Sequence, residues 1–185
     1  YYTDISNSTN LPITVYNNPN ANLMDLDMLK RLASIKNVIG VKYTAPTHFN
    51  FSKIKKEIGE NFKIYSGMDE MALSGLISGA DGIIGSFYNL MPEMFVDIYA
   101  KVKEGNINAA KKIQEKINII ILYALGKSGY PFIKMGLNWL GIDSGYVRKP
   151  FTTFIDREIE KTIKNDLKKL TDQNDLSGIK FLDTI

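Results

Sequence analysis

The stretch Val38-Ile39-Gly40-Val41-Lys42-Tyr43-Thr44 is the most informative segment of the sequence. Apart from Lys42, it has the apolar, β-branched composition of a strand that is buried on both faces of a parallel sheet. Lysine is rarely buried, and a desolvated ammonium loses its proton more readily, which gives a neutral amine that can attack a ketone. Lys42 is therefore a candidate nucleophile. The alternative is a lysine at a strand end that reaches solvent or pairs with a carboxylate.

Three further runs resemble strands, and helical patterns separate all four. The strand-like runs are residues 13–16, 38–43, 62–65 and 82–85, and the helical spacings between them lie at residues 24–32, 51–58 and 70–78. This βαβαβαβ order predicts a parallel α/β sheet. Four βα units are half of a (β/α)8 TIM barrel, and alone they would leave two sheet edges unpaired. We therefore expect that the other half of such a barrel lies elsewhere in the polypeptide, that two half-barrels associate, or that the sheet is an open one.

The second half of the chain carries helical patterns without further strands. We expect helices over residues 92–105, 106–126, 131–140 and 155–170, and a polar, frayed stretch after Thr171. Pro92 suits the first turn of a helix, and Asn106 suits a helix start. The predicted division is a half-barrel over residues 1–90 and a helical region over residues 91–185.

The composition excludes several classes of protein. Of the 185 residues, 44% are hydrophobic and 23% are charged, which is typical of a folded globular domain. The net charge of +3 is spread in mixed signs, which argues against a nucleic-acid partner. The absence of cysteine excludes disulfides and thiolate metal sites. The longest apolar run, residues 119–125, is shorter than the roughly 20 residues that cross a bilayer, so we expect a cytoplasmic protein without a membrane partner.

Each of the four predicted strands ends in polar residues. Catalytic residues of βα barrels gather at these carboxyl ends. Each residue also has an ordinary interpretation, such as Asp69 and Glu70 as acids at a helix start or Ser86 as a turn residue. Together, however, these polar sets predict one active site at the carboxyl ends of the strands. The four sets are Tyr16-Asn17-Asn18-Pro19, Lys42-Tyr43-Thr44, Ser66-Gly67-Met68-Asp69-Glu70 and Gly85-Ser86-Phe87-Tyr88-Asn89.

At these residues the sequence resembles the N-acetylneuraminate lyases, which belong to an aldolase superfamily that also contains dihydrodipicolinate synthase. The resemblance covers nearly the whole chain and corresponds to the C-terminal portion of those enzymes, with residues 1–90 as strands 5–8 of the barrel. It is carried by Val15-Tyr16-Asn17-Asn18-Pro19, Gly40-Val41-Lys42-Tyr43-Thr44, Gly67-Met68-Asp69-Glu70-Met71 and the run from Gly79 to Asn89.

The resemblance implies a role for each site residue. Lys42 would form the Schiff base, and Tyr16 would relay a proton at the C4 hydroxyl of the substrate. The sugar would be held by Thr44, Gly67, Asp69, Glu70 and Ser86. Sialic acid would be cleaved to pyruvate and N-acetylmannosamine without a metal or cofactor, because the iminium is the electron sink. A homotetramer is also implied.

Two features of the sequence distinguish the branches of the superfamily. The synthase branch usually has an arginine shortly after the Tyr-Asn-x-Pro motif, whereas this chain has Asn20-Ala21-Asn22, and its Gly67 to Glu70 segment resembles the lyase branch. The Gly-Ser/Thr-Thr-Gly-Glu segment that binds the substrate carboxylate is absent from these residues, so we expect the N-terminal half of the barrel to supply it. The alternatives are a sister 2-keto acid aldolase, such as dihydrodipicolinate synthase, and a non-catalytic half-barrel that self-associates.

Overall fold

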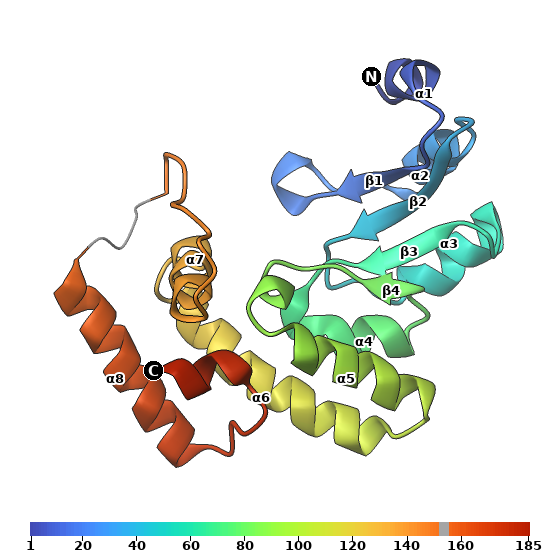
Figure 1. Ribbon diagram of the computed structural model, residues 1–185. Helices are drawn as coiled ribbons and strands as arrows, with labels where there is room; N and C mark the ends of the chain where they lie inside the picture. The colour runs from blue at the N-terminus through green and yellow to red at the C-terminus, as the bar shows by residue number, and fades with distance from the viewer. Residues whose placement is uncertain (152–155) are drawn as a thin grey trace. The chain divides into compact units, whose positions relative to one another are not determined.

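The structure, a computed structural model, describes residues 1–151 and 156–185. It divides the chain into two compact units, Tyr1–Ile84 and Gly85–Ile185, which are described separately. The first unit contains a sheet with its helices, and the second contains helices only (Figure 1). The predicted start of the last helix, at residue 155, lies outside the described residues.

The first unit contains a four-stranded parallel sheet. Its strands are β1 (Ile13–Asn17), β2 (Val38–Tyr43), β3 (Lys63–Ser66) and β4 (Gly82–Ile83). They lie side by side in the order β1-β2-β3-β4, and every neighbouring pair is parallel. The predicted parallel α/β arrangement is therefore confirmed. Compared with the sequence prediction, β3 lies one residue later and β4 is shorter.

Helices cover one face of this sheet (Figure 1). They are α2 (Leu26–Ala33), α3 (Asn50–Ile58) and α4 (Ala72–Ile77), and a short helix α1 (Tyr2–Ser8), which the sequence did not predict, precedes β1. The core residues Val15, Val41 and Ile64 are fully buried, at 0% exposure, and they occupy one register row of β1, β2 and β3. Since side chains alternate along a strand, the residues between them point to the opposite face.

Two glycines allow close approach within the first unit. A β-carbon on Gly40 would overlap the Lys63 carbonyl oxygen and would lie 2.9 Å from Lys63 Cβ. A β-carbon on Gly75 in α4 would overlap the side chain of Ser66 in β3. Gly40 therefore lets β2 and β3 pair closely, and Gly75 lets α4 pack against the sheet.

An ion-pair cluster joins α3, the start of β3 and the segment before β4. Asp81 accepts hydrogen bonds from Lys55 Nζ at 2.8 Å and from the Ile64 backbone amide at 2.8 Å, and Lys63 Nζ lies 3.4 Å from its other oxygen. Burial acts to raise the pKa of Asp81, but these donors outweigh it and hold that pKa below its usual value.

The second unit is helical. Its helices are α5 (Pro92–Lys103), α6 (Ile107–Leu125), α7 (Tyr130–Trp139) and α8 (Arg157–Gln173), followed by the 3-10 turn η4 (Lys180–Thr184). Helices α5 and α6 pack against each other. The Asn106 side chain caps α6 by accepting a hydrogen bond from the Ala109 amide at 3.2 Å. The four predicted helices are thus present, with boundaries shifted by a few residues.

The prediction of a frayed stretch after Thr171 was wrong. Helix α8 continues to Gln173, and Leu176, Ile179 and Phe181 are at most 2% exposed. The Phe181 ring packs edge-on against Phe132 in α7, with ring centroids 6.2 Å apart. The polar residues of this stretch therefore alternate with apolar residues that complete the core of the helical unit.

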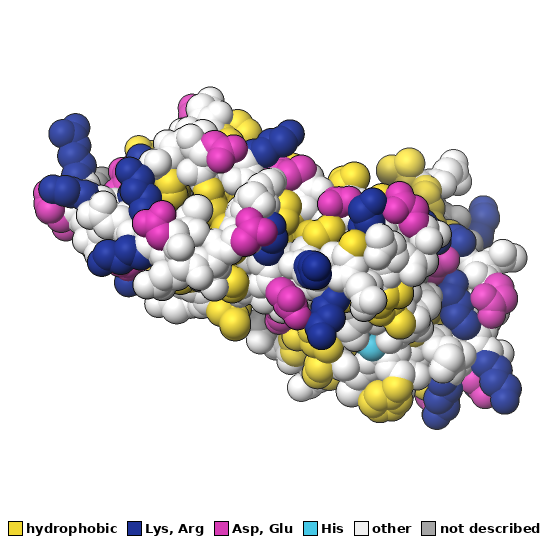
Figure 2. All heavy atoms as spheres, turned by 90° about the horizontal axis from the view of Figure 1, so that it is seen from below, with side chains coloured by type: hydrophobic (Ala, Val, Ile, Leu, Met, Phe, Trp, Pro, Cys, Tyr) yellow, Lys and Arg dark blue, Asp and Glu magenta, His cyan; other side chains and the backbone are white. Residues whose placement is uncertain are grey.

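The described residues contain no helix that is both long and apolar enough to span a bilayer. On the face shown in Figure 2, basic and acidic side chains are interspersed and do not gather in one patch of a single sign.

Candidate active site

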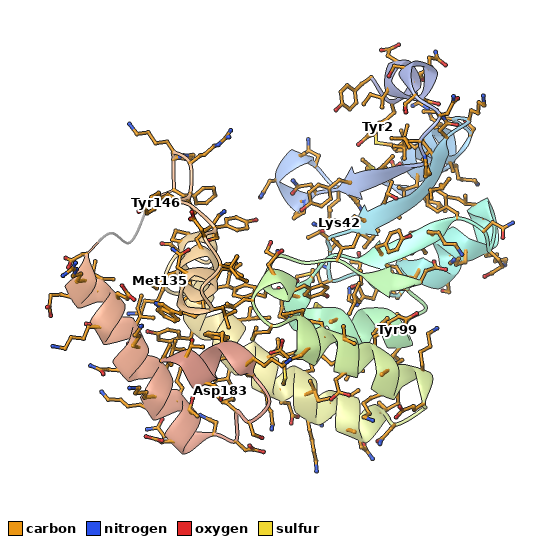
Figure 3. The ribbon with its side chains drawn as sticks, viewed as in Figure 1. Tyr2, Lys42, Tyr99, Met135, Tyr146 and Asp183 are labelled. Carbon is orange, nitrogen blue, oxygen red and sulfur yellow. The ribbon has the colours of Figure 1, made fainter. Side chains whose placement is uncertain are left out.

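The register of the sheet brings the predicted catalytic residues together. Tyr16 in β1 is the register partner of Lys42 in β2, and Lys42 is the partner of Tyr65 in β3. Side chains at partnered positions of parallel strands project from the same face. The buried residues Val15, Val41 and Ile64 project from the opposite face, toward the core. Lys42 lies near the carboxyl ends of the strands (Figure 3).

Lys42 contacts the ring of Tyr16 directly. Its ammonium nitrogen lies 4.4 Å from the ring centroid, a distance typical of a cation–π interaction. Tyr16 is 42% exposed and Lys42 is half-buried. A phenol therefore lies beside the amine, on a face of the sheet that is partly exposed to solvent.

Gly67 closes the other side of the Lys42 side chain. A β-carbon on Gly67 would overlap Thr44 Oγ1 and would lie 3.2 Å from Lys42 Cε. The Gly67 amide donates to the Tyr43 carbonyl at 2.9 Å, which holds the segment after β3 against the end of β2. Only a glycine at this position leaves room for both neighbouring side chains.

Thr44 carries a buried hydroxyl. Its Oγ1 is shielded from solvent and has no hydrogen-bond partner in the described part of the chain. A buried polar atom without a partner calls for an explanation, because desolvation without a hydrogen bond destabilises the fold. Because this hydroxyl lies next to Lys42 and Gly67, it could form a hydrogen bond with a ligand bound at Lys42.

The remaining predicted site residues fall into two groups. Asp69 and Glu70 begin the 3-10 turn η2 (Asp69–Met71) that follows β3, with Asp69 buried and Glu70 half-buried. Ser86 belongs to the second unit, where it precedes the turn η3 (Phe87–Asn89) and its carbonyl accepts from Asn89 Nδ2 at 3.0 Å. The structure thus brings Tyr16, Lys42, Thr44 and Gly67 together within one unit.

Asn17, which the sequence motif gave no role of its own, supports this arrangement from the core side of the sheet. It is fully buried, its side-chain oxygen accepts from the Met24 amide at 2.8 Å, and its carbonyl accepts from the Thr44 amide at 3.1 Å. These bonds tie the end of β1 to the end of β2. An amide at the last position of a buried strand was the signal in the sequence.

His48 lies in the segment between β2 and α3. It is 4% exposed, and its Nδ1 lies 3.0 Å from Ser74 Oγ. Burial lowers the pKa of His48 below its usual value. Among the described residues, no three His, Asp or Glu side chains gather in a way that could hold a metal ion.

The chain matches the model of a known protein family. The model of the dihydrodipicolinate synthetase family matches residues 1–170. The chain belongs to this family. The match includes all of the site residues described above, and it confirms the relationship that the sequence motifs indicated.

Solved structures from both branches of the family match the chain. The N-acetylneuraminate lyase of Fusobacterium nucleatum, solved in complex with pyruvate, is 32% identical, with a TM-score of 0.81 over 91% of this chain and 57% of that one. CdNal of Clostridium difficile, solved in complex with mannosamine, is 31% identical, with a TM-score of 0.83 over 91% of this chain and 58% of that one.

The synthase branch also matches. Dihydrodipicolinate synthase of Aquifex aeolicus is 25% identical, with a TM-score of 0.79 over 92% of this chain and 59% of that one. The chain therefore spans somewhat less than three fifths of the length of these structures. Its parallel sheet corresponds to part of a TIM barrel, as predicted.

Proposed function

We propose that Lys42 forms a Schiff base with a 2-keto acid and that the protein carrying this chain cleaves N-acetylneuraminate to pyruvate and N-acetylmannosamine. The observation that carries the proposal is the Lys42 ammonium over the Tyr16 ring at the carboxyl ends of the strands. An amine nucleophile next to a phenol is the pair that such a cleavage needs.

Each step of the reaction uses a group on this face. The neutral Lys42 amine attacks the ketone carbon of the open-chain sugar acid, and loss of water gives an iminium. A base then removes the proton of the C4 hydroxyl, with Tyr16 relaying it, and the bond between C3 and C4 breaks. Its electron pair moves into the iminium to give an enamine, and the C4 carbon leaves as the aldehyde of N-acetylmannosamine. Protonation at C3 and hydrolysis release pyruvate and restore Lys42.

The polar groups near Lys42 support an assignment of substrate-binding roles. We assign the unpartnered Thr44 hydroxyl to a hydrogen bond with the substrate, since a ligand would satisfy this buried atom. Gly67 makes room for it. Asp69, Glu70 and Ser86 are proposed to accept hydrogen bonds from the hydroxyl groups of the sugar.

The lyase assignment is favoured over a sister aldolase by two observations. The matched lyases are 30–32% identical to the chain, whereas the matched synthases are 25% identical. The segment after Tyr16 also has Asn20-Ala21-Asn22 and lacks the arginine of the synthase branch. Pyruvate bound in the Fusobacterium structure and mannosamine in the Clostridium structure are ligands related to the two products.

Borohydride trapping with pyruvate tests the nucleophile. We expect a reduced pyruvate adduct on the peptide that contains Lys42 and no adduct in Lys42→Arg. The matched control is Lys63→Arg, which changes a lysine on the neighbouring strand that pairs with Asp81 and not with Tyr16. Absence of an adduct in a folded sample would reject the proposed chemistry.

Product analysis then separates the alternatives. Release of N-acetylmannosamine from N-acetylneuraminate supports the lyase. An adduct without that release, but with condensation of pyruvate and another aldehyde, supports a sister aldolase. No adduct together with a concentration-dependent oligomer supports a self-associating half-barrel. The proposal includes a homotetramer, which sedimentation velocity would measure.

A further inference from the structure

Tyr65 is a half-buried aromatic residue that the proposed chemistry leaves without a role. It is the register partner of Lys42 on one side and of Gly82 in β4 on the other. It therefore projects from the same face as Lys42, one strand away, which is about 4.8 Å in a sheet. The sequence motifs around Lys42 and Gly67 did not single it out.

The ring of Tyr65 lies over the backbone of β4. A β-carbon on Gly82 would lie 3.1 Å from Tyr65 Cδ1 and 3.3 Å from Cε1. These distances are shorter than ordinary carbon–carbon contacts of about 3.5–4.0 Å, so the ring occupies the space that a side chain at position 82 would need. The atoms of Tyr65 that make this contact belong to its ring.

Lys42 extends in the opposite direction. Its ammonium lies over the Tyr16 ring in β1. On its other side, a β-carbon on Gly67, directly after β3, would lie 3.2 Å from its Cε. A lysine side chain has four carbons with free rotation, and nothing within β2 itself fixes its direction. On the side of Lys42 that faces β4, its register partner is Tyr65, whose ring reaches over Gly82.

We propose that Tyr65 is a positioning residue, whose ring excludes the Lys42 side chain from the β4 side of the sheet and keeps its amine over Tyr16. The inference rests on the proposed function for its consequence in catalysis, but the placement of the amine can be measured without any substrate. The ring performs this role, with Gly82 as the surface on which it lies.

The first experiment measures the placement of the amine. Lysines of the protein that carries these residues are reductively methylated with ¹³C-formaldehyde, and the Lys42 signal is assigned with Lys42→Arg. Because the amine lies over a ring face, its methyl groups should show an upfield ring-current shift, and Tyr16→Leu defines how much of that shift comes from Tyr16. We expect Tyr65→Leu to lose most of the Tyr16 contribution and Tyr65→Phe to retain it.

The second experiment measures the rate of borohydride trapping with pyruvate. Displacement of a reacting group by about 1 Å can slow a reaction roughly 100-fold, so we expect a 10- to 100-fold slower adduct formation in Tyr65→Leu. Tyr65→Phe should stay within about twofold of the wild type because its ring is unchanged. Gly82→Ala, which pushes the ring toward β2, should alter both the shift and the rate, and it covers the case in which Tyr65→Leu does not fold.

The outcomes separate the inference from the proposed function. If Tyr65→Leu and Gly82→Ala keep the wild-type shift, or if the wild type shows no ring-current shift, the positioning role is refuted. If Tyr65→Phe behaves like Tyr65→Leu, the hydroxyl acts and the proposed role of the ring is wrong. If the shifts follow the expectation but no pyruvate adduct forms on Lys42, the positioning role stands and the proposed function fails.

Discussion

Replacement of Gly67 by alanine tests the geometry of the candidate site most directly. The new β-carbon would overlap Thr44 Oγ1, would lie 3.1 Å from Thr44 Cβ and would lie 3.2 Å from Lys42 Cε. Thr44 must therefore rotate or move. Lys42 must retreat, because its Cε is about 0.3–0.8 Å closer than an ordinary carbon–carbon contact of about 3.5–4.0 Å.

The structure sets the expected size of both effects. Overpacking by one methyl group costs about 1–3 kcal/mol, so the free energy of unfolding should fall by about that amount. A shift of Lys42 by several tenths of an ångström is a large part of the roughly 1 Å displacement that slows a reaction about 100-fold. We expect the rate of pyruvate trapping to fall by about 10- to 100-fold.

The assays are urea unfolding and the time course of borohydride trapping. Gly126→Ala is the matched control, because Gly126 has an ordinary right-handed conformation and its nearest neighbour would be 3.4 Å from the added β-carbon. Thr44→Ala combined with Gly67→Ala removes the overlapping hydroxyl. It should therefore recover part of the lost stability, which a double-mutant cycle measures.

A Gly67→Ala protein with wild-type stability and wild-type trapping rate would refute the close packing of Gly67 against Thr44 and Lys42. The double variant could regain stability while its trapping rate stays low. In that case, the contact of the added β-carbon with Lys42 Cε causes the loss of rate.

Three further predictions concern stability. Burial acts to raise the pKa of Asp81, but its hydrogen-bond donors lower that pKa below its unfolded value near 4. The stability that Asp81 contributes is therefore present above about pH 4 and is lost as pH falls through the lowered pKa. Asp81→Asn should cost about 1–3 kcal/mol at pH 7 and should flatten the pH dependence of urea unfolding below pH 5. Burial lowers the pKa of His48, so stability should decline as pH falls below about 6.5, and His48→Gln should remove that decline in thermal unfolding at pH 5.5 and 7.5. Phe181→Ala should cost about 3–5 kcal/mol in urea unfolding, whereas a freely exposed end of the chain would give no change.

The parallel strands and the unusual position of Lys42 within one of them could be predicted from the sequence because both depend on local patterns. The apolar run around Lys42 predicted β2 over the residues that form it, and one unusual lysine within that run indicated chemistry. The neighbouring position of Tyr16 followed from the rule that parallel strands end at one edge.

Other features depended on contacts between segments that are distant in the sequence. The apolar residues after Thr171, such as Phe181, have too irregular a spacing to indicate a helix face, and only packing against Phe132 orders them. Tyr65 was placed at the end of its predicted strand, but its position beside Lys42 depends on the register between β2 and β3, which local patterns do not fix. The predicted division into a half-barrel over residues 1–90 and a helical region over residues 91–185 stays a prediction.

The close approach of Gly40 to the Lys63 carbonyl has a consequence for engineering the proposed active site. Any side chain at position 40 would have to part β2 from β3, two residues before Lys42. A strand that slipped by one residue to relieve this overlap would turn the Lys42 amine into the core and Tyr43 out of it. Mutant libraries that aim at new substrates should therefore leave position 40 constant, although this glycine has no side chain with which to touch a substrate.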